Sequence, residues 1–224
     1  MNDKRLPWCE FICEVTENKG MMAVKMLMAR WPMIADVFHP KRGSELDLIR
    51  IDLALFLRNG LFFPIQIKTH PNALPTHFRK CPYIYATAVT GRTNVEMLAN
   101  EFEEVVRKHA EKFHELKSCA PNWGIDRPRS ARKRPGPLLK ELSRNSRLIS
   151  SYHQADRNGQ LFSCGATGIV FLRNGFAALI RRDWPGIPPL RFPGIVVPPR
   201  LTPRDEALRI IEEIKRRAKE LRDC

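Results

Sequence analysis

The chain has 224 residues, of which 43% are hydrophobic and 28% are charged, and its net charge is +14. This composition is typical of a globular protein and excludes a disordered or fibrous chain. The sequence has no apolar run of about 18 residues, and its N-terminus lacks the apolar core of a signal peptide. We therefore expect a cytoplasmic protein with no membrane partner.

The positive charge is concentrated in the second half of the chain. Residues 121–224 contain 21 Lys and Arg residues against 10 Asp and Glu residues, so they hold +11 of the total +14. An excess of this size attracts polyanions and favours contacts with phosphate groups. Nucleic acid is the expected partner, DNA first and RNA as the alternative.

The first predicted element is a helix over residues 17–31. This stretch is apolar on nearly every side, as in a helix that is buried against a sheet, and Pro32 ends it. Residues 33–39 predict the first strand. Residues 47–57 and 61–69 are rich in Ile, Leu and Phe and are separated by Arg58-Asn59-Gly60, which predicts a β-hairpin.

The loop length of this hairpin decides which side chains share a face. A three-residue loop with Gly60 in the left-handed conformation gives one apolar face and places Asp52 opposite Gln66, with Lys68 one step further along. A two-residue Asn-Gly turn would mix polar and apolar residues on both faces, and Asp47 would then replace Asp52. Burial of one face favours the three-residue loop, so Asp47 is the reserve candidate.

The segment Ile65-Gln66-Ile67-Lys68-Thr69, preceded by Asp52, resembles the PD-(D/E)xK nuclease superfamily, in particular members that read Ile-Gln-Val-Lys-Thr. The resemblance implies an α/β fold of the restriction-endonuclease type, with a mixed sheet flanked by helices. It implies that Asp52 and Gln66 bind Mg²⁺ or Mn²⁺ and that Lys68 is the catalytic lysine. Oxygen ligands and a nearby positive charge suit such a site.

The sequence departs from the superfamily at two positions. The first helix of the family often carries a Glu where this chain has Val24, so Glu17 or Glu14 is the candidate third metal ligand. Gln66 replaces an acid and lowers the negative charge of the site. The alternative interpretation of the Asp, Gln and Lys side chains is the ordinary solvent face of an antiparallel sheet.

A fourth strand over residues 83–90 and a long helix over residues 93–118 complete a nuclease-like domain, residues 1–120. A Pro-rich linker, residues 121–137, follows and is too rich in Pro and Gly for a regular element. Its basic side chains are expected either to grip phosphates or to be solvated, and they are Arg127, Arg129, Arg132, Lys133 and Arg134.

A basic α+β region, residues 138–224, follows the linker. It repeats Phe-Leu-Arg-Asn-Gly at Phe171, 115 residues after Phe56. In the same register Thr167, Arg181 and Asp183 replace Asp52, Gln66 and Lys68, so this second hairpin cannot hold the same metal site. We interpret the echo as shared turn chemistry rather than duplication, and we expect Arg181 and Arg182 to contact nucleic acid.

The end of the chain predicts two further features. Seven prolines between residues 184 and 203 indicate an extended segment. Thr202 as N-cap and Pro203 at the first helical position then predict a helix to about residue 221. The six Cys and six His residues do not fall at zinc spacing.

The leading functional hypothesis is a metal-dependent endonuclease that hydrolyses DNA. The alternative is a nucleic-acid-binding protein that keeps a nuclease-like core without catalysis, and a third interpretation is an assembly protein with a basic linker. The sequence leaves the oligomeric state open, with a homodimer as one option.

Overall fold

The computed structural model describes residues 7–112, 137–145 and 147–221 and shows a mixed α/β fold. Eight strands form one sheet in the order β1-β2-β3-β7-β6-β5, with β4 added to β3 and β8 added to β7. No helix within the described residues is both long and apolar enough to span a membrane.

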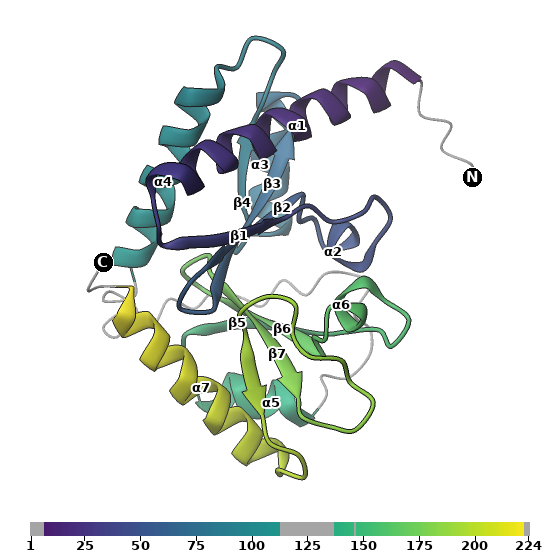
Figure 1. The fold of residues 1–224 in the computed structure, drawn as a ribbon, viewed down its shortest axis with the longest axis vertical. Helices are drawn as coiled ribbons and strands as arrows, with labels where there is room; N and C mark the ends of the chain where they lie inside the picture. The colour runs from purple at the N-terminus through teal and green to yellow at the C-terminus, as the bar shows by residue number, and fades with distance from the viewer. Residues whose placement is uncertain (1–6, 113–136, 146, 222–224) are drawn as a thin grey trace.

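The first half of the chain forms the upper part of Figure 1. Its elements are α1 (Pro7–Arg30), β1 (Ile34–Phe38), α2 (Glu45–Leu48), β2 (Leu53–Leu57), β3 (Leu61–Lys68), the 3₁₀ turn η1 (Pro71–Ala73), α3 (Leu74–Lys80), β4 (Tyr85–Ala88) and α4 (Val95–Glu111). The second half forms the lower part of Figure 1. Its elements are α5 (Pro137–Asn145), β5 (Ile149–Gln154), α6 (Gln160–Ser163), β6 (Gly168–Leu172), β7 (Ala177–Arg182), β8 (Ile195–Val197) and α7 (Pro203–Glu220).

The predicted register of the first hairpin is confirmed. Leu53 lies opposite Ile65 and Phe56 opposite Phe62, and Gly60 closes the three-residue loop with a φ of 80°. The predicted strand over residues 47–57 is wrong in its first half. Residues 45–48 form α2 instead, because Ser44 caps a helical turn, and the chain leaves that turn through the left-handed Arg50 before β2 begins.

The other boundaries differ from prediction in smaller ways. Helix α1 begins ten residues earlier than predicted, at Pro7. Helix α4 ends at Glu111, and the last part of the predicted helix, residues 113–118, lies outside the described residues. The Pro-rich segment contains the short strand β8, which pairs in parallel with β7. The C-terminal helix α7 is confirmed, with Thr202 accepting a hydrogen bond from the Asp205 amide.

The two halves repeat one topology. In each half a helix is followed by three antiparallel strands and then by a strand parallel to the third one, with a final helix. We call the halves the first repeat (α1 to α4) and the second repeat (α5 to α7). Our interpretation of the Phe-Leu-Arg-Asn-Gly echo as shared turn chemistry alone is therefore wrong, since the two hairpins hold equivalent places in equivalent structures.

A pseudo-two-fold axis relates the repeats where β3 meets β7. Phe62 pairs with Ala177, and the 115-residue offset between the repeats takes Phe62 to Ala177 itself. The turns also exchange partners. Asn59 Nδ2 donates to the carbonyl of Arg217 in α7 at 3.0 Å, and Asn174 Nδ2 donates to the carbonyl of His109 in α4 at 3.4 Å. The hairpin turn of each repeat thus forms a hydrogen bond to the last helix of the other repeat.

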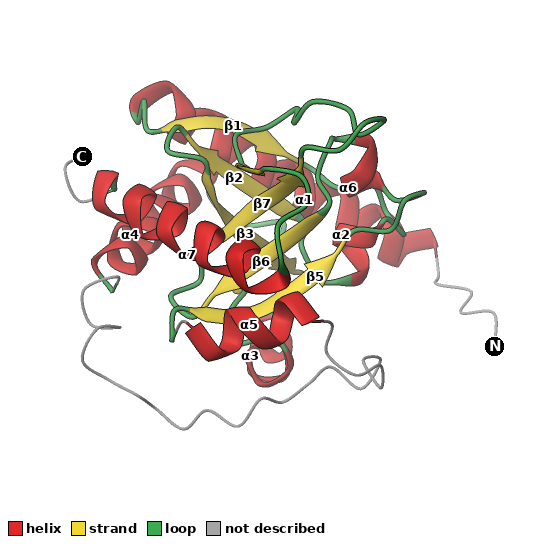
Figure 2. Ribbon diagram, turned by 90° about the horizontal axis from the view of Figure 1, so that it is seen from below, coloured by secondary structure: helices red, strands yellow, loops and turns green. Residues whose placement is uncertain are grey.

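The sheet has a separate core on each face. Helices α1, α4, α5 and α7 cover one face, where they bury the apolar side of the hairpins, and Figure 2 shows helices packed around the central strands. The other face is covered by α2, α6 and the segments that precede β4 and β8. On this second face Phe192 stacks on Phe56 at 4.5 Å, and Tyr83 contacts Phe171, the equivalent of Phe56.

Candidate functional site

Asp52 lies at the turn that joins α2 to β2, next to the end of β3. Its amide donates to the Ile65 carbonyl at 2.9 Å, which extends the hairpin ladder by one residue. Its Oδ2 accepts a hydrogen bond from the Ile67 amide at 2.6 Å and another from Gln66 Nε2. The Asp52 and Gln66 side chains are 9% and 6% exposed, so they are not an ordinary solvent-facing pair.

Lys68, the last residue of β3, is half-buried beside this pair. Burial lowers the pKa of its ammonium, and the Asp52 carboxylate opposes this shift. Arg50 lies close enough to lower the pKa of Lys68 further. The structure therefore brings Asp52, Gln66 and Lys68 together, as the register predicts.

Helix α1 contributes a carboxylate two turns before the position at which the superfamily carries its Glu. Val24 is fully buried in the core, whereas Glu17 lies near the site, where its Oε2 is 3.1 Å from His39 Nε2. Glu17 also acts electrostatically on Asp52. Glu14 is exposed to solvent. Of the two acids named as candidates, Glu17 is the one whose charge acts on Asp52.

Burial is the main cause of an unusual pKa at Asp52. Loss of hydration raises the pKa of this carboxyl from 3.8 to about 6, and the Ile67 amide opposes the shift by its hydrogen bond. Glu17 and Asp47 raise the pKa further, and Lys68 lowers it. A buried carboxylate among other acids is a costly arrangement, and such arrangements are concentrated at functional sites.

This pKa predicts how stability depends on pH. Because the pKa of Asp52 is higher in the folded chain than in the unfolded chain, its stabilising contribution is complete below about pH 4 and is lost as the pH rises through about 6. We expect Asp52→Asn to raise the free energy of unfolding at pH 8 by about 1–3 kcal/mol, and to give no gain at pH 4. Urea unfolding in buffer with a chelator measures both values. A variant that is less stable than wild type at pH 8 would instead identify Asp52 as a purely structural acceptor.

The charges around Asp52 suit a divalent cation. Within the described part of the chain no three His, Cys, Asp or Glu side chains converge on one point, and the polar side chain bonded to Asp52 is the Gln66 amide. A half-turn of that amide presents Oε1 instead of Nε2 toward Asp52. With Asp52 and Glu17 it offers the oxygen ligands that Mg²⁺ or Mn²⁺ takes in addition to water. A cation there would also offset the charges of Glu17 and Asp47, which add to the effect of burial on the pKa of Asp52.

Two residues near Asp52 differ from the sequence prediction. His39 holds Glu17 and was not singled out, because a lone His at the end of a strand has no distinguishing spacing. The hydrogen bond to Glu17 raises the pKa of His39 above its usual value. Asp47, the reserve candidate, lies in α2 rather than in a strand, and its Oδ2 accepts a hydrogen bond from the Gly43 amide at 2.6 Å.

The two arginines of β7 that are expected to contact nucleic acid, Arg181 and Arg182, bond to groups within the protein. Arg182 forms two hydrogen bonds with the Glu206 carboxylate, at 2.7 and 3.0 Å. Arg181 donates to Asp183 and to the carbonyls of Ile187 and Pro188. A role for Arg181 and Arg182 in binding nucleic acid stays a prediction. The linker candidates Arg127, Arg129, Arg132, Lys133 and Arg134 lie outside the described residues.

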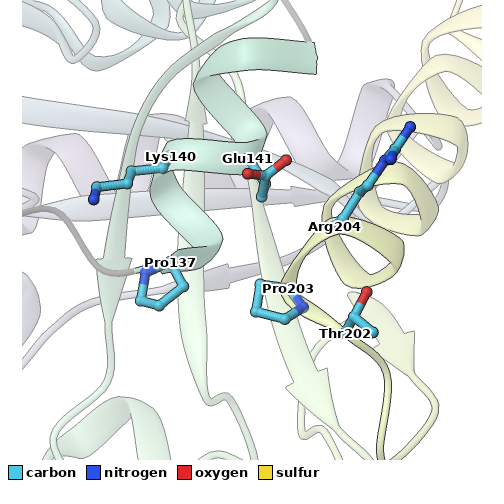
Figure 3. A pocket seen from close by; sticks show the side chains of 6 residues that line it. All are labelled: Pro137, Lys140, Glu141, Thr202, Pro203 and Arg204. Atoms are coloured by element: carbon cyan, nitrogen blue, oxygen red, sulfur yellow. The ribbon is translucent and has the colours of Figure 1, made fainter.

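A shallow surface hollow of about 340 Å³ lies elsewhere, between α5 and the start of α7 (Figure 3). Its lining combines prolines with polar and charged side chains, namely Pro137, Lys140, Glu141, Thr202, Pro203 and Arg204. None of these residues belongs to the Asp52 cluster, so the hollow is separate from the candidate site.

Comparisons with protein-family models, with curated proteins and with solved structures found no match for this chain.

Proposed function

We propose that the protein is a metal-dependent endonuclease that hydrolyses phosphodiester bonds of DNA, on a restriction-endonuclease-like core formed by the first repeat. The observation that carries the proposal is the buried Asp52 carboxylate, whose pKa is about 6, held against Gln66 and close to Glu17 and Lys68. The order of a helix followed by three antiparallel strands agrees with what the resemblance implies.

The residues divide the chemistry between them. Asp52, Glu17 and the Gln66 amide would hold Mg²⁺ or Mn²⁺, and a bound cation supplies a Lewis acid that polarises the phosphate. Lys68 places positive charge where negative charge develops on the phosphate and orients the attacking water. The water oxygen forms a bond to phosphorus and gives up a proton to bulk water, the bond to the leaving oxygen breaks, and that oxygen takes up a proton. Hydrolysis needs no other co-reactant.

The charge of the chain supports a polyanionic substrate. With a net charge of +14 and a sequence pI near 9.9, the protein attracts nucleic acid at neutral pH. Because this attraction depends on the phosphate backbone, it does not separate DNA from RNA. Parallel cleavage assays on DNA and RNA of the same sequence distinguish the two.

Lys68→Ala tests the catalytic part of the proposal. We expect this variant to lower the rate of Mg²⁺-dependent DNA cleavage by about 10²–10³-fold, since it removes a charge that stabilises the transition state. Lys215→Ala is the matched control, because Lys215 is an exposed lysine of α7 and its loss changes the net charge equally. Equal rates for the two variants, or cleavage that survives a chelator, would contradict the role of Lys68.

A second candidate function is nucleic-acid binding without catalysis. The observation that favours it is the Gln66 amide, which donates both to Asp52 and to the Ile67 carbonyl at 3.3 Å, so the pair is satisfied without a metal ion. This candidate predicts DNA binding that weakens steeply with salt and no cleavage with Mg²⁺ or Mn²⁺.

A further inference from the structure

The pseudo-two-fold axis assigns Asp52, Gln66 and Lys68 equivalents among the described residues of the second repeat. The 115-residue offset takes Asp52 to Thr167, Gln66 to Arg181 and Lys68 to Asp183. These equivalents are confirmed by the pairing of the strands, since β6 and β7 have the same three-residue loop and the same register as β2 and β3. The surroundings of Thr167 can therefore be compared with those of Asp52 atom by atom.

Thr167 preserves the backbone contact of Asp52 without its charge. Its Oγ1 accepts from the Arg182 amide at 3.1 Å, and Arg182 is the equivalent of Ile67, whose amide donates to Asp52 Oδ2. The Thr167 hydroxyl in turn donates to the Ile180 carbonyl at 3.1 Å. The fold thus needs an acceptor at this position in both repeats, whereas only the first repeat supplies a carboxylate.

The neighbours of Thr167 exclude a cation from the place in the second repeat that is equivalent to the candidate metal site. Arg181 places a guanidinium where the first repeat has the Gln66 amide, and this group is fixed by Asp183 at 2.7 Å and by the carbonyls of Ile187 and Pro188. Asp183 occupies the place of Lys68, and its negative charge is neutralised by the ion pair with Arg181. A positive charge at a ligand position opposes binding of a divalent metal ion.

The two positions lie on one face of the sheet but far apart. Gln66 and Arg181 are each four residues from the Phe62–Ala177 pair, in opposite directions along antiparallel strands, so they are separated by about 26 Å. A chain with two competent halves could reach both strands of a duplex from this face. This chain has one competent half.

We propose, on the basis of the proposed function, that each chain cuts only one strand of a bound DNA duplex and so produces nicks. The second repeat has the same topology as the first repeat but no catalytic site, so it does not hydrolyse DNA. Cleavage of both strands then requires two chains or two successive binding events.

Supercoiled plasmid tests this inference. With plasmid in excess, we expect open circles to accumulate first, at a rate proportional to protein concentration, and linear DNA to appear only after further nicks. Asp183→Asn is the control and should nick like wild type, because Asp183 belongs to the second repeat. Linear DNA formed from the start, without open circles, by protein that is monomeric in analytical ultracentrifugation would overturn the single-strand inference and leave the proposed function standing.

Counting bound Mn²⁺ by electron paramagnetic resonance separates the two proposals. One Mn²⁺ per chain, lost in Asp52→Thr and kept in Asp183→Asn, supports a single competent half even where the plasmid is not cut. Two Mn²⁺ per chain would overturn the inference. No bound Mn²⁺ together with no cleavage would overturn the proposed function, and the inference with it.

Discussion

Replacement of Asp52 by Thr is expected to lower the rate of Mg²⁺-dependent DNA cleavage by about 10³-fold while the chain stays folded. The substitution is one that the protein itself contains, because Thr167 occupies the equivalent place and accepts the equivalent amide at 3.1 Å. Asp52→Thr should thus keep the bond from the Ile67 amide and lose only the carboxylate. Single-turnover cleavage gives the rate, and circular dichroism verifies the fold.

Asp36→Thr is the matched control for this prediction. Asp36 is an exposed acid on the neighbouring strand β1, so the control removes the same charge without touching the site. Cleavage by Asp52→Thr within about threefold of the Asp36→Thr rate would show that Asp52 is not a metal ligand in an active enzyme.

Replacement of Phe62 by Ala is expected to lower the free energy of unfolding by about 3–5 kcal/mol. Phe62 is 1% exposed, lies at the pseudo-two-fold axis opposite Ala177, and its ring centroid is 5.1 Å from that of Phe56. The cavity would open where the two repeats share a core, so both should lose stability together. Urea unfolding followed by circular dichroism measures the change.

The exposed side chain of Met97 provides the control for Phe62. Met97 is 71% exposed on α4, and Met97→Ala should change the free energy of unfolding by less than about 0.5 kcal/mol. Two separate transitions in the Phe62→Ala variant, one of them at the wild-type midpoint, would show that the repeats unfold independently.

The hairpin register could be predicted from its open end, where the polar residues Asp52, Gln66 and Lys68 alternate with apolar ones. A shift by one residue would have mixed polar and apolar side chains on both faces, so a single register gathers the polar groups on one face. Helix α2 could not be predicted in the same way. Its four residues, Glu45-Leu46-Asp47-Leu48, alternate polar and apolar side chains as a strand does, and the left-handed residue after it is Arg50, not the Gly that marks such positions.

The sequence offers Glu17 and Glu14 as candidates for the third metal ligand on α1, but it does not decide between them. The residues of α1 are apolar on several sides, and the helix begins at Pro7, so spacing alone does not fix which turn approaches β2. The contact of Glu17 with His39 depends on how α1 crosses the sheet. Such long-range packing is not encoded in a local pattern.

The internal repeat was visible in only five residues because its interlocking contacts join different residue types. Phe62 meets Ala177, and the pair Asn59 with Arg217 is equivalent to Asn174 with His109. Each position tolerates different side chains as long as the backbone bond is kept. The two halves therefore share their topology with little similarity in sequence.

Location of Mn²⁺ in a crystal of the protein tests the central claim most directly. The metal is identified by its anomalous scattering. We predict one anomalous peak per chain, between the side-chain oxygens of Asp52 and Gln66 and next to Glu17, with no peak beside Thr167. A crystal with Mn²⁺ in excess and no peak at Asp52, and with Gln66 Nε2 still bonded to that carboxylate, would contradict the assignment of this cluster as a metal-dependent active site.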